Sequence, residues 1–512
     1  MAFVSNLGLA FQAVANKHAA RAALHYPQSG EKTTYAELAQ LVEKIARQLV
    51  RRGYKQGDVG AIFHDKSPAA FATMLACLRL GIVYTNLDPD SPWERLRKIL
   101  TSCQPRFVVN SFSELHHIQN VAELCEVIDL AELMAEGPSG ACELPALAAI
   151  SGSTPSYIMF TSGSTGHPKG AVMSHANLLC FIAWGQDRFG ITPEDVFTNA
   201  NPIYFDNSVF DFYTAIFSGA TLVPFSHSQA NDSRLLVRLA GESGCTIWFS
   251  VPSLLVYLLT TRALSAESLP RLRKIIFGGE GFPKPKLKQL FDMFGQRAEL
   301  ENVYGPTECT CICSAHTIHA ADFEDMQNLA TLGYLSQNFD GEILALDTND
   351  PDFGELLLLG PHVGMGYFND PDRTAQSFIQ NPRHSRYRDI GYRTGDLVCR
   401  DSAGRLHFKG RADFQIKHMG YRIELEEIEA ALSTIPDVKE CAVVYQKLGD
   451  GMGQILGFVA SDKKADSEQL IAQVAAIVPP YMVPKRIEVV EDLPKNANGK
   501  IDRQALLKMK NS

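Results

Sequence analysis

The chain has 512 residues, 46% hydrophobic and 21% charged, a composition typical of a globular protein rather than a disordered or collagen-like one. Its formal net charge of −9 leaves no basic excess for the phosphates of a nucleic acid or an anionic lipid surface. No apolar run approaches the roughly 18 residues that a membrane helix needs, so we expect neither a nucleic-acid partner nor membrane insertion. The eleven cysteines, an odd number in a chain of this size, favour reduced thiols and a cytoplasmic location.

Helical and strand-like segments alternate through the first 400 residues, which predicts an α/β domain of layered helices and mostly parallel strands. Thr34 and Glu37 form a capping box ahead of an amphipathic helix that we expect to end at Gly53. Short apolar runs bounded by glycine, proline or charge predict buried strands at 59–63, 107–110, 156–160, 246–250 and 274–277.

After Arg411 the pattern changes to that of a small α+β unit. The predicted elements are a helix at 424–432, strands at 441–445 and 455–460, a helix at 467–477 and a strand at 487–490. We therefore predict a large N-terminal domain over 1–410, a hinge at 411–413 and a small mobile C-terminal domain over 414–512.

The loop that follows the apolar strand at 157–160 carries the clearest chemical signal. Residues 161–170 hold three glycines, four hydroxyl side chains and the cation of Lys169. Glycines let backbone N–H groups approach an anion closely, and hydroxyls and an ammonium add donors, so the loop suits a polyphosphate. The spacing is not that of a Walker loop, and a polar surface turn is the alternative.

In its order of residues this loop resembles the signature loop of the adenylate-forming enzymes, the superfamily of acyl-CoA synthetases, luciferases and the adenylation domains of non-ribosomal peptide synthesis. Further motifs follow in that family's order, at 302–308, 392–397, 410–417 with 420–424, and 494–500. In detail the chain is most similar to stand-alone amino-acid-activating members such as the D-alanyl carrier protein ligases.

The resemblance implies that ATP binds to the large domain. The residues implied in contact with ATP are Thr161, Ser162, Gly163, Ser164, Thr165, Gly166 and Lys169 at the β- and γ-phosphates, Gly279, Glu280, Gly281, Asn302, Tyr304 and Gly305 around adenine, and Asp396 and Arg411 at the ribose. Thr307 is implied beside the α-phosphate and Glu308 as the Mg²⁺ ligand, a suitable group for a hard cation. Lys500 is implied as the catalytic lysine that bridges the substrate carboxylate and the α-phosphate.

The same resemblance implies a second half-reaction. Asp413 corresponds to the hinge residue, and Lys417 and Gly420 correspond to the channel for a phosphopantetheine thiol. The sequence holds no carrier segment with a serine in a Gly-Gly-x-Ser setting, so we expect the acceptor to be a separate carrier protein.

For the substrate, the stretch 201–208 resembles the motif in which an aspartate pairs with the ammonium of an amino acid. Asp206 takes that position; capping of the following helix is the alternative role. The family's specificity positions correspond here to Asn207, Phe210, Phe249, Ile276, Gly278, Val303, Cys311 and Ile312. None is charged and several are bulky, which predicts a small neutral amino acid of the alanine, glycine, serine or proline type.

Other interpretations remain open. An acyl- or aryl-CoA synthetase would use the same adenylation chemistry with another acceptor, and a phosphate-loop ATPase or kinase or a non-catalytic nucleotide-binding protein are more distant alternatives. Cys309, Cys311 and Cys313 alternate as in a strand with all thiols on one face, which we interpret as buried thiols rather than a metal site. The acidic residues at 424–429 are expected on a solvated helix face.

Overall fold

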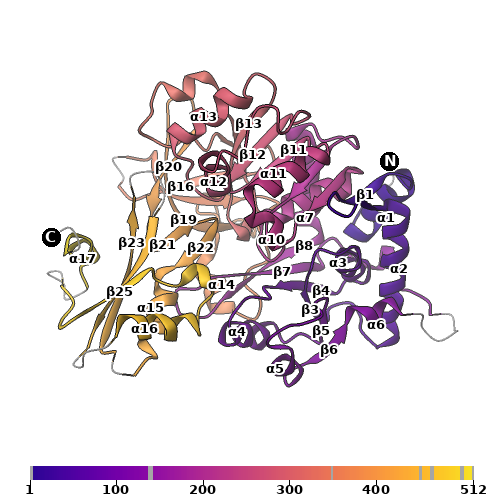
Figure 1. The fold of residues 1–512 in the computed structure, drawn as a ribbon, viewed down its shortest axis with the longest axis horizontal. Helices are drawn as coiled ribbons and strands as arrows, with labels where there is room; N and C mark the ends of the chain where they lie inside the picture. The colour runs from indigo at the N-terminus through magenta and orange to yellow at the C-terminus, as the bar shows by residue number, and fades with distance from the viewer. Residues whose placement is uncertain are drawn as a thin grey trace. The chain divides into compact units, whose positions relative to one another are not determined.

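The computed structural model describes residues 4–135, 142–347, 350–436, 438–448, 453–461, 466–495 and 501–509 (Figure 1). The chain divides into two compact units. The first consists of Met1–Leu87, Cys103–Met159 and Gly170–Ala412, and the second of Asp88–Ser102, Phe160–Lys169 and Asp413–Ser512. The model is mixed α/β, as the alternation of segments predicts. Among the described residues, no helix combines the length and the apolar character needed to span a bilayer.

A six-stranded sheet has the strand order β6-β5-β3-β4-β7-β8. Its strands are β3 Val59–Phe63, β4 Val83–Leu87, β5 Phe107–Asn110, β6 Glu126–Asp129, β7 Pro155–Thr161 and β8 Lys169–Ser174. The first five strands in this order pair in parallel, which requires crossover connections such as helix α3, Pro68–Leu80, between β3 and β4. Strands β7 and β8 lead into and out of the glycine-rich loop.

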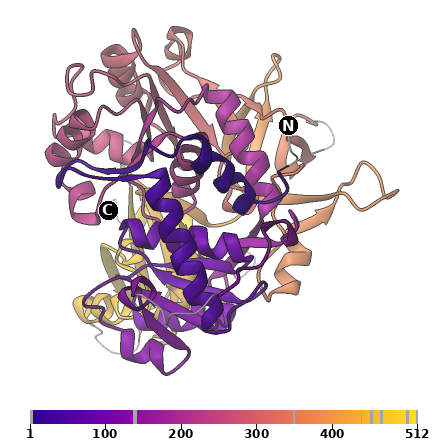
Figure 2. The same cartoon turned by 90° about the vertical axis from the view of Figure 1, so that its right-hand side faces the viewer.

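Helices α1 Leu7–Lys17, α2 Tyr35–Arg51 and α3 pack on one another in the first unit (indigo in Figure 2). The predicted capping box begins α2: the backbone N–H of Glu37 donates to the Thr34 hydroxyl over 3.2 Å, and the carboxylate of Glu37 accepts the Thr34 N–H over 2.7 Å. Leu38, Val42 and Ile45 of α2 are buried in the core shared with α1 and α3.

The second large sheet has nine strands in the order β15-β14-β13-β12-β11-β9-β10-β1-β2. They are β1 Ala22–Tyr26, β2 Glu31–Thr34, β9 Val196–Asn199, β10 Thr221–Pro224, β11 Ile247–Ser250, β12 Lys274–Gly278, β13 Glu299–Tyr304, β14 Ser314–Thr317 and β15 Tyr334–Leu335. The strands from β13 to β1 in this order are parallel, and β2, β14 and β15 are antiparallel additions at the edges. The carboxyl ends of β9, β11, β12 and β13 therefore lie at one edge, where α/β sheets usually bind ligands.

Both faces of this sheet are buried. Trp248, Ile275 and Phe277 lie in a core with helices α11 Ser233–Glu242, α12 Pro252–Thr260 and α13 Lys284–Phe294, which lie beside β11–β13 in Figure 1. Phe249 and Ile276, which alternate with them along the strands, lie in the other core with helix α7, His175–Phe189.

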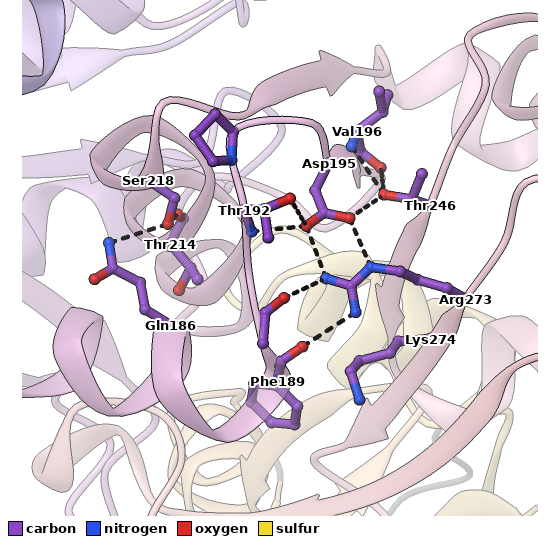
Figure 3. Close-up of polar contacts among 12 residues, drawn as sticks. Gln186, Phe189, Thr192, Asp195, Val196, Thr214, Ser218, Thr246, Arg273 and Lys274 are labelled. Atoms are coloured by element: carbon purple, nitrogen blue, oxygen red, sulfur yellow. Dashed lines mark hydrogen bonds and ion pairs between the residues drawn. The ribbon is translucent and has the colours of Figure 1, made fainter. Parts of the chain in front are cut away.

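The amino-terminal ends of the same strands are joined by a buried polar cluster (Figure 3). The Asp195 carboxylate accepts two hydrogen bonds from the Arg273 guanidinium, each 2.7 Å long, and one from the Thr246 hydroxyl, also 2.7 Å. These residues immediately precede β9, β12 and β11 respectively. Burial alone would raise the pKa of Asp195, but the hydrogen bonds from Arg273, Thr192 and Thr246 hold that pKa below its usual value.

The first unit also contains an antiparallel sheet of β16 Asp340–Ala345, β17 Phe353–Leu359, β18 Phe378–Gln380, β19 Ile390–Arg400 and β20 Leu406–Arg411. Its shorter helices are α5 Ile118–Ala122, α6 Leu130–Met134, α8 Asn207–Val209, α9 Ala215–Ser218, α10 His227–Asn231 and α14 Pro371–Ser377. A π-helical segment, η2, spans Phe210–Thr214.

The second unit contains helix α4, Trp93–Cys103, whose last residue belongs to the first unit, the hairpin β21 Gln415–His418 and β22 Tyr421–Glu424, and the three-stranded sheet β23 Glu440–Lys447, β24 Gly453–Ala460 and β25 Arg486–Val490. Helices α15 Leu425–Ser433 and α16 Ser467–Ala475 pack on one face of that sheet, and α17 Arg503–Met509 on the other. The helices and strands expected after residue 423 are all present within a few residues of their predicted bounds.

Candidate functional site

Asp206 lies in the segment that connects the carboxyl end of β9 to helix α8. Its side chain makes no capping hydrogen bond to α8, so the alternative role of a helix cap is wrong. Instead, the Thr307 hydroxyl donates a hydrogen bond to Oδ2 of Asp206 over 2.6 Å. The structure thus joins the residue expected at the substrate ammonium to the one expected at the α-phosphate.

The other residues expected to select the substrate gather at the same edge of the sheet. Phe249 and Ile276 are neighbours on adjacent strands, and the rings of Phe210 and Phe249 lie 5.1 Å apart, edge to face. A Cβ atom added to Gly278 would lie only 2.7 Å from Cγ2 of Val303, so this position packs tightly. The cluster is apolar and closely packed, as a site for a small side chain requires.

Cys311 lies beside this cluster in an unusual backbone conformation. Thr310 and Cys311 both have left-handed φ values, 59° and 76°, so 309–313 is not an extended strand and the expectation of three thiols on one strand face is wrong. A non-glycine residue in this region is strained, and such strain concentrates at functional sites. Burial raises the pKa of Cys311 well above its usual value, and the charges of Asp206 and Asp211 raise it further.

Tyr304, Asp396 and Arg411 form one connected group. The Tyr304 hydroxyl donates to Oδ2 of Asp396 over 2.6 Å, and Nη1 of Arg411 donates to Oδ1 over 2.5 Å. Asp396 and Arg411 face each other on β19 and β20, and Tyr304 is the last residue of β13. Burial, followed by the Asp396 charge, raises the pKa of Tyr304 well above its usual value. The structure therefore assembles three of the residues expected around the nucleoside.

The remaining residues expected near adenine lie at the ends of β12 and β13. Asn302 donates to the Thr331 carbonyl over 2.8 Å, and the Glu280 carboxylate accepts the backbone N–H of Ser253 over 2.6 Å. Gly279 has a φ of 90°, and a Cβ added to Gly305 would collide with the Cys311 carbonyl at 2.3 Å. These two positions require glycine for backbone reasons. Gly281, whose added Cβ would meet Leu329, follows in the same loop.

Glu308 is fully buried in the middle of the short 3-10 turn Thr307–Cys309. Its Oε1 accepts the Tyr367 hydroxyl over 2.8 Å, and its backbone carbonyl accepts the Gly364 N–H over 2.9 Å. These two contacts hold the carboxylate in one position, and a single held carboxylate is a common protein ligand for Mg²⁺ that also binds phosphate oxygens. Within the described ranges, this site included, no group of three or more His, Cys, Asp or Glu residues is arranged to hold a metal ion.

The glycine-rich loop belongs to the second unit. The Thr161 hydroxyl is buried and has no hydrogen-bond partner among the described residues, whereas Ser164 and Thr165 are exposed. Gly166 has a φ of 74°, and its carbonyl accepts Nζ of Lys98 over 2.7 Å. An unsatisfied buried donor and a glycine-dependent turn fit a loop that holds an anion.

Acidic residues of the same unit contact this loop. Lys169 pairs with Glu424 over 3.2 Å, and the backbone N–H of Gly163 donates to Oε2 of Glu427 over 3.1 Å. The Ser162 hydroxyl donates to the Arg422 carbonyl over 2.8 Å. Glu427 also pairs with the buried side chain of Arg95. The prediction of a solvated acidic face at 424–429 is therefore wrong for Glu424 and Glu427, which are both buried.

The residues expected to act in the second half-reaction are in the second unit, and the lysine expected to act in the first step is outside the described residues. Oδ1 of Asp413 accepts the Gln415 N–H over 3.2 Å. Lys417 lies on β21, and Gly420, with a φ of 82°, forms the β21–β22 turn with Met419. Lys500 lies outside the described residues.

Two residues near Asp206 were missed by the sequence reasoning. Lys66 and Asp211 both contact Asn199 and Asn201, at the start of the segment that carries Asp206. Lys66 is an isolated lysine between a strand and a helix and belongs to no recognisable motif. Asp211 lies in a run of aromatic residues, which indicates only that this acidic residue is buried.

Comparison with known proteins identifies the family. A family model described as AMP-binding enzyme matches residues 11–368, and one described as AMP-binding enzyme C-terminal domain matches 427–500. The chain is 34% identical over 489 residues to an L-proline (L-prolyl-carrier protein) ligase of Pseudomonas fluorescens, covering 92% of this chain and 93% of that protein. It is 30% identical to a D-alanine–D-alanyl carrier protein ligase of Lacticaseibacillus rhamnosus, covering 98% and 99%.

A solved structure of an NRPS protein containing adenylation and PCP domains superposes with a TM-score of 0.82 and 26% identity, covering 99% of this chain and 84% of that one. The fold, the family models and the relatives thus agree with the resemblance that the motifs carry, and the chain belongs to the family of AMP-binding, adenylate-forming enzymes.

Proposed function

We propose that this enzyme uses ATP to activate a small neutral amino acid as its aminoacyl-AMP and then transfers the aminoacyl group to the phosphopantetheine thiol of a separate carrier protein. The observation that carries the proposal is the position of Asp206, a carboxylate held by Thr307 at the carboxyl edge of the parallel sheet. Relatives at 30% and 34% identity over nearly the whole chain are named as ligases of D-alanine and L-proline with carrier proteins, which supports the same reaction class.

The substrate is proposed to bind with its ammonium group at Asp206. A carboxylate next to an apolar cluster is a suitable counter-ion for an amino acid, whereas a fatty or aryl acid would leave it unpaired. Phe210, Phe249 and Ile276 are bulky, buried and closely packed, which favours a small side chain. Alanine, glycine, serine and proline fit this description.

The nucleotide is proposed to bind through two groups of residues. Asp396 would accept hydrogen bonds from the vicinal ribose hydroxyls, with Arg411 beside it and Tyr304 against the adenine. The loop 161–169 would hold the β- and γ-phosphates through its backbone N–H groups, its hydroxyls and Lys169. Glu308 would hold Mg²⁺, which neutralises phosphate charge during the reaction.

The chemistry proceeds in two steps. In the first, a carboxylate oxygen of the amino acid bonds to the α-phosphorus, the bond to the β-phosphate oxygen breaks, and pyrophosphate leaves. Thr307 would donate to the α-phosphate, and Lys500 would stabilise the charge that develops between the two reactants. In the second, the thiolate of the carrier attacks the acyl carbon and AMP leaves. Asp413 would act as the hinge between these steps, and Lys417 and Gly420 would line the thiol channel.

We also propose a cytoplasmic location. The reaction requires ATP and a free thiol, and none of the eleven cysteines, which all lie in the described ranges, forms a disulfide.

The experiment that tests the function is amino-acid-dependent exchange of labelled pyrophosphate into ATP, measured across the proteinogenic amino acids, their D-isomers and matched carboxylic acids without an amine. We expect strong exchange with one small neutral amino acid and a loss of more than about 100-fold in kcat/KM for Asp206→Asn, because the ammonium loses its counter-charge. Asp292→Asn, on the exposed face of α13, is the matched control. Exchange with amine-free acids alone, followed by CoA-dependent turnover, would replace the proposal with an acyl- or aryl-CoA synthetase.

A further inference from the structure

A buried polar cluster lies at the carboxyl end of β9, and the mechanism above uses none of its residues. The side-chain amides of Asn199 and Asn201 donate to Oδ2 of Asp211 over 3.1 and 2.9 Å, and that of Asn201 also donates to the Phe249 carbonyl over 3.1 Å. Asp211 is fully buried in the π-helical segment η2, and its Oδ1 has no hydrogen-bond partner among the described residues. Short π-helical segments often mark functional sites.

Lys66 holds the same two asparagines through their backbones. Its ammonium donates to the carbonyls of Asn199 over 2.8 Å and Asn201 over 2.9 Å. The backbone of Lys66 is left-handed, with a φ of 64°, and its own carbonyl accepts the Tyr26 hydroxyl over 2.7 Å. Asp211 therefore holds the side chains of Asn199 and Asn201, and Lys66 holds their backbone carbonyls.

The segment that these contacts hold leads directly to Asp206. Asn199 is the last residue of β9, and residues 200–205 carry the chain from there to Asp206. The Ile203 carbonyl in this stretch accepts further hydrogen bonds, from the Asn86 amide over 3.2 Å and from the Ser208 hydroxyl over 3.1 Å. A shift at Asn199 or Asn201 would therefore be passed to the Asp206 carboxylate.

We propose that Lys66 and Asp211 are positioning residues for amino-acid recognition: they fix Asn199 and Asn201, and through them the carboxylate of Asp206. This inference rests on the proposed function, since it assigns these two residues to the amine-binding half of the site. It predicts that their loss weakens binding of the amino acid and leaves binding of ATP unchanged.

The shifted pKa values of Lys66 and Asp211 support a role for these residues beyond stabilising the fold. Burial lowers the pKa of Lys66 to about 7, against the opposing effect of the Asp211 charge. Burial raises the pKa of Asp211 to about 8, although the amides of Asn201 and Asn199 and the charge of Lys66 lower it. Desolvation therefore dominates at both residues, and groups that are costly to bury are poor choices for stability alone.

The opposite end of β9 provides the comparison. There Asp195 has a bidentate guanidinium partner and a lowered pKa, which is the behaviour of a stabilising pair. Lys274, also buried and at the start of β12, pairs with Glu299 at that same amino-terminal end. Lys274 is thus a buried lysine on the same sheet, far along the strands from Asp206, with which the half-buried Lys66 can be compared.

The test compares Lys66→Met, Lys66→Arg, Asp211→Asn and Lys274→Met in the pyrophosphate exchange assay, with Tm measured for each. We expect Lys66→Met and Asp211→Asn to raise KM for the amino acid by about 10- to 100-fold, as small misplacements of a binding group do, with KM for ATP within about twofold of wild type. Lys66→Arg retains a cationic donor and should recover part of the loss. Lys274→Met should lower Tm with both KM values unchanged.

Folded variants of Lys66 and Asp211 that keep the wild-type KM for the amino acid, or raise both KM values equally, would overturn the inference. If Lys66→Met does not fold, Asp211→Asn, which preserves size and shape, decides the question alone. Failure of the proposed function gives a different result: wild-type enzyme that exchanges only amine-free acids rejects that function and this inference together. Wild-type exchange with an amino acid and unaltered variants rejects this inference only.

Discussion

The hydroxyl of Thr307 donates to the carboxylate of Asp206 over 2.6 Å, so the residues proposed to bind the two reactants are in direct contact. Hydrogen bonds to a charged acceptor contribute about 1.5–3 kcal/mol. In the proposed mechanism, an ammonium group that binds Asp206 competes for that carboxylate and leaves the Thr307 hydroxyl available to phosphate.

The first prediction is that Thr307→Val lowers kcat/KM about 10- to 100-fold, because it removes the donor to Asp206 and the proposed donor to the α-phosphate. Thr307→Ser, which keeps the hydroxyl, should stay within about threefold of wild type. A double-mutant cycle with Asp206→Asn should be non-additive, since the two side chains are in contact. Additive effects in the exchange assay would show that the hydrogen bond does not link the two half-sites.

The second prediction concerns the ribose. Asp396→Asn should raise KM for ATP about 10- to 100-fold, because it weakens a charged acceptor that Tyr304 and Arg411 hold in place. KM for the amino acid should change little. Asp401→Asn, in the turn between the same two strands, is the control and should leave both KM values unchanged. The assay is pyrophosphate exchange with ATP and 2′-deoxy-ATP, and equal discrimination by wild type and Asp396→Asn would contradict the ribose assignment.

The local elements of the fold were predictable from the sequence, because their signals are local. The Thr34–Glu37 capping box and the apolar runs that form β3 and β5 depend on residues a few positions apart. Two of the wrong interpretations have long-range or backbone causes. Glu427 is buried because it pairs with Arg95, which lies 332 positions away in the sequence. Residues 309–313 do not form a strand because Thr310 and Cys311 adopt left-handed backbone conformations, which cannot be predicted from the residue types.

Some residues of the candidate site could likewise be predicted from sequence motifs, whereas others could be recognised only in the structure. Motifs placed Asp206, Thr307, Tyr304 and Asp396 on the list of expected site residues, and the structure supplies the contacts among them. Their individual roles stay predictions. Lys66 and Asp211 were not predictable, because their proposed role depends on their contacts with Asn199 and Asn201, which only the structure shows.

The third prediction concerns stability at the amino ends of the strands (Figure 3). Asp195 has a lowered pKa in the folded protein, so its contribution to stability is present above the unfolded value of 3.8 and is lost as the pH falls through the folded value. Asp195→Asn should therefore lower the free energy of unfolding at pH 7 by about 1.5–3 kcal/mol, and the difference from wild type should disappear in acid. Thermal scanning between pH 7 and pH 3 measures this, with Asp292→Asn unchanged throughout; a difference that grows in acid would contradict it.

The fourth prediction concerns the size of the substrate. Cys311→Gly should not lower Tm, because glycine adopts a φ of 76° without the roughly 1 kcal/mol of strain that a side chain brings. It should also increase exchange with larger amino acids relative to the wild-type substrate, since it removes a side chain next to Phe210. Cys313→Gly, at a buried position without a left-handed backbone, should lower Tm and leave the preference unchanged. An unaltered preference in Cys311→Gly would remove Cys311 from the substrate site.

The contacts of the glycine-rich loop have a consequence for how nucleotide affinity is measured. The Glu424 carboxylate pairs with Lys169, and the Glu427 carboxylate accepts the Gly163 N–H. In this state the protein's own carboxylates therefore bind two of the donors that are proposed for phosphate. An incoming polyphosphate must displace them before it gains those donors, and the observed dissociation constant reports the difference between the two occupants. Removing a carboxylate from this unit would therefore tighten the binding of an anion without adding a single contact to it.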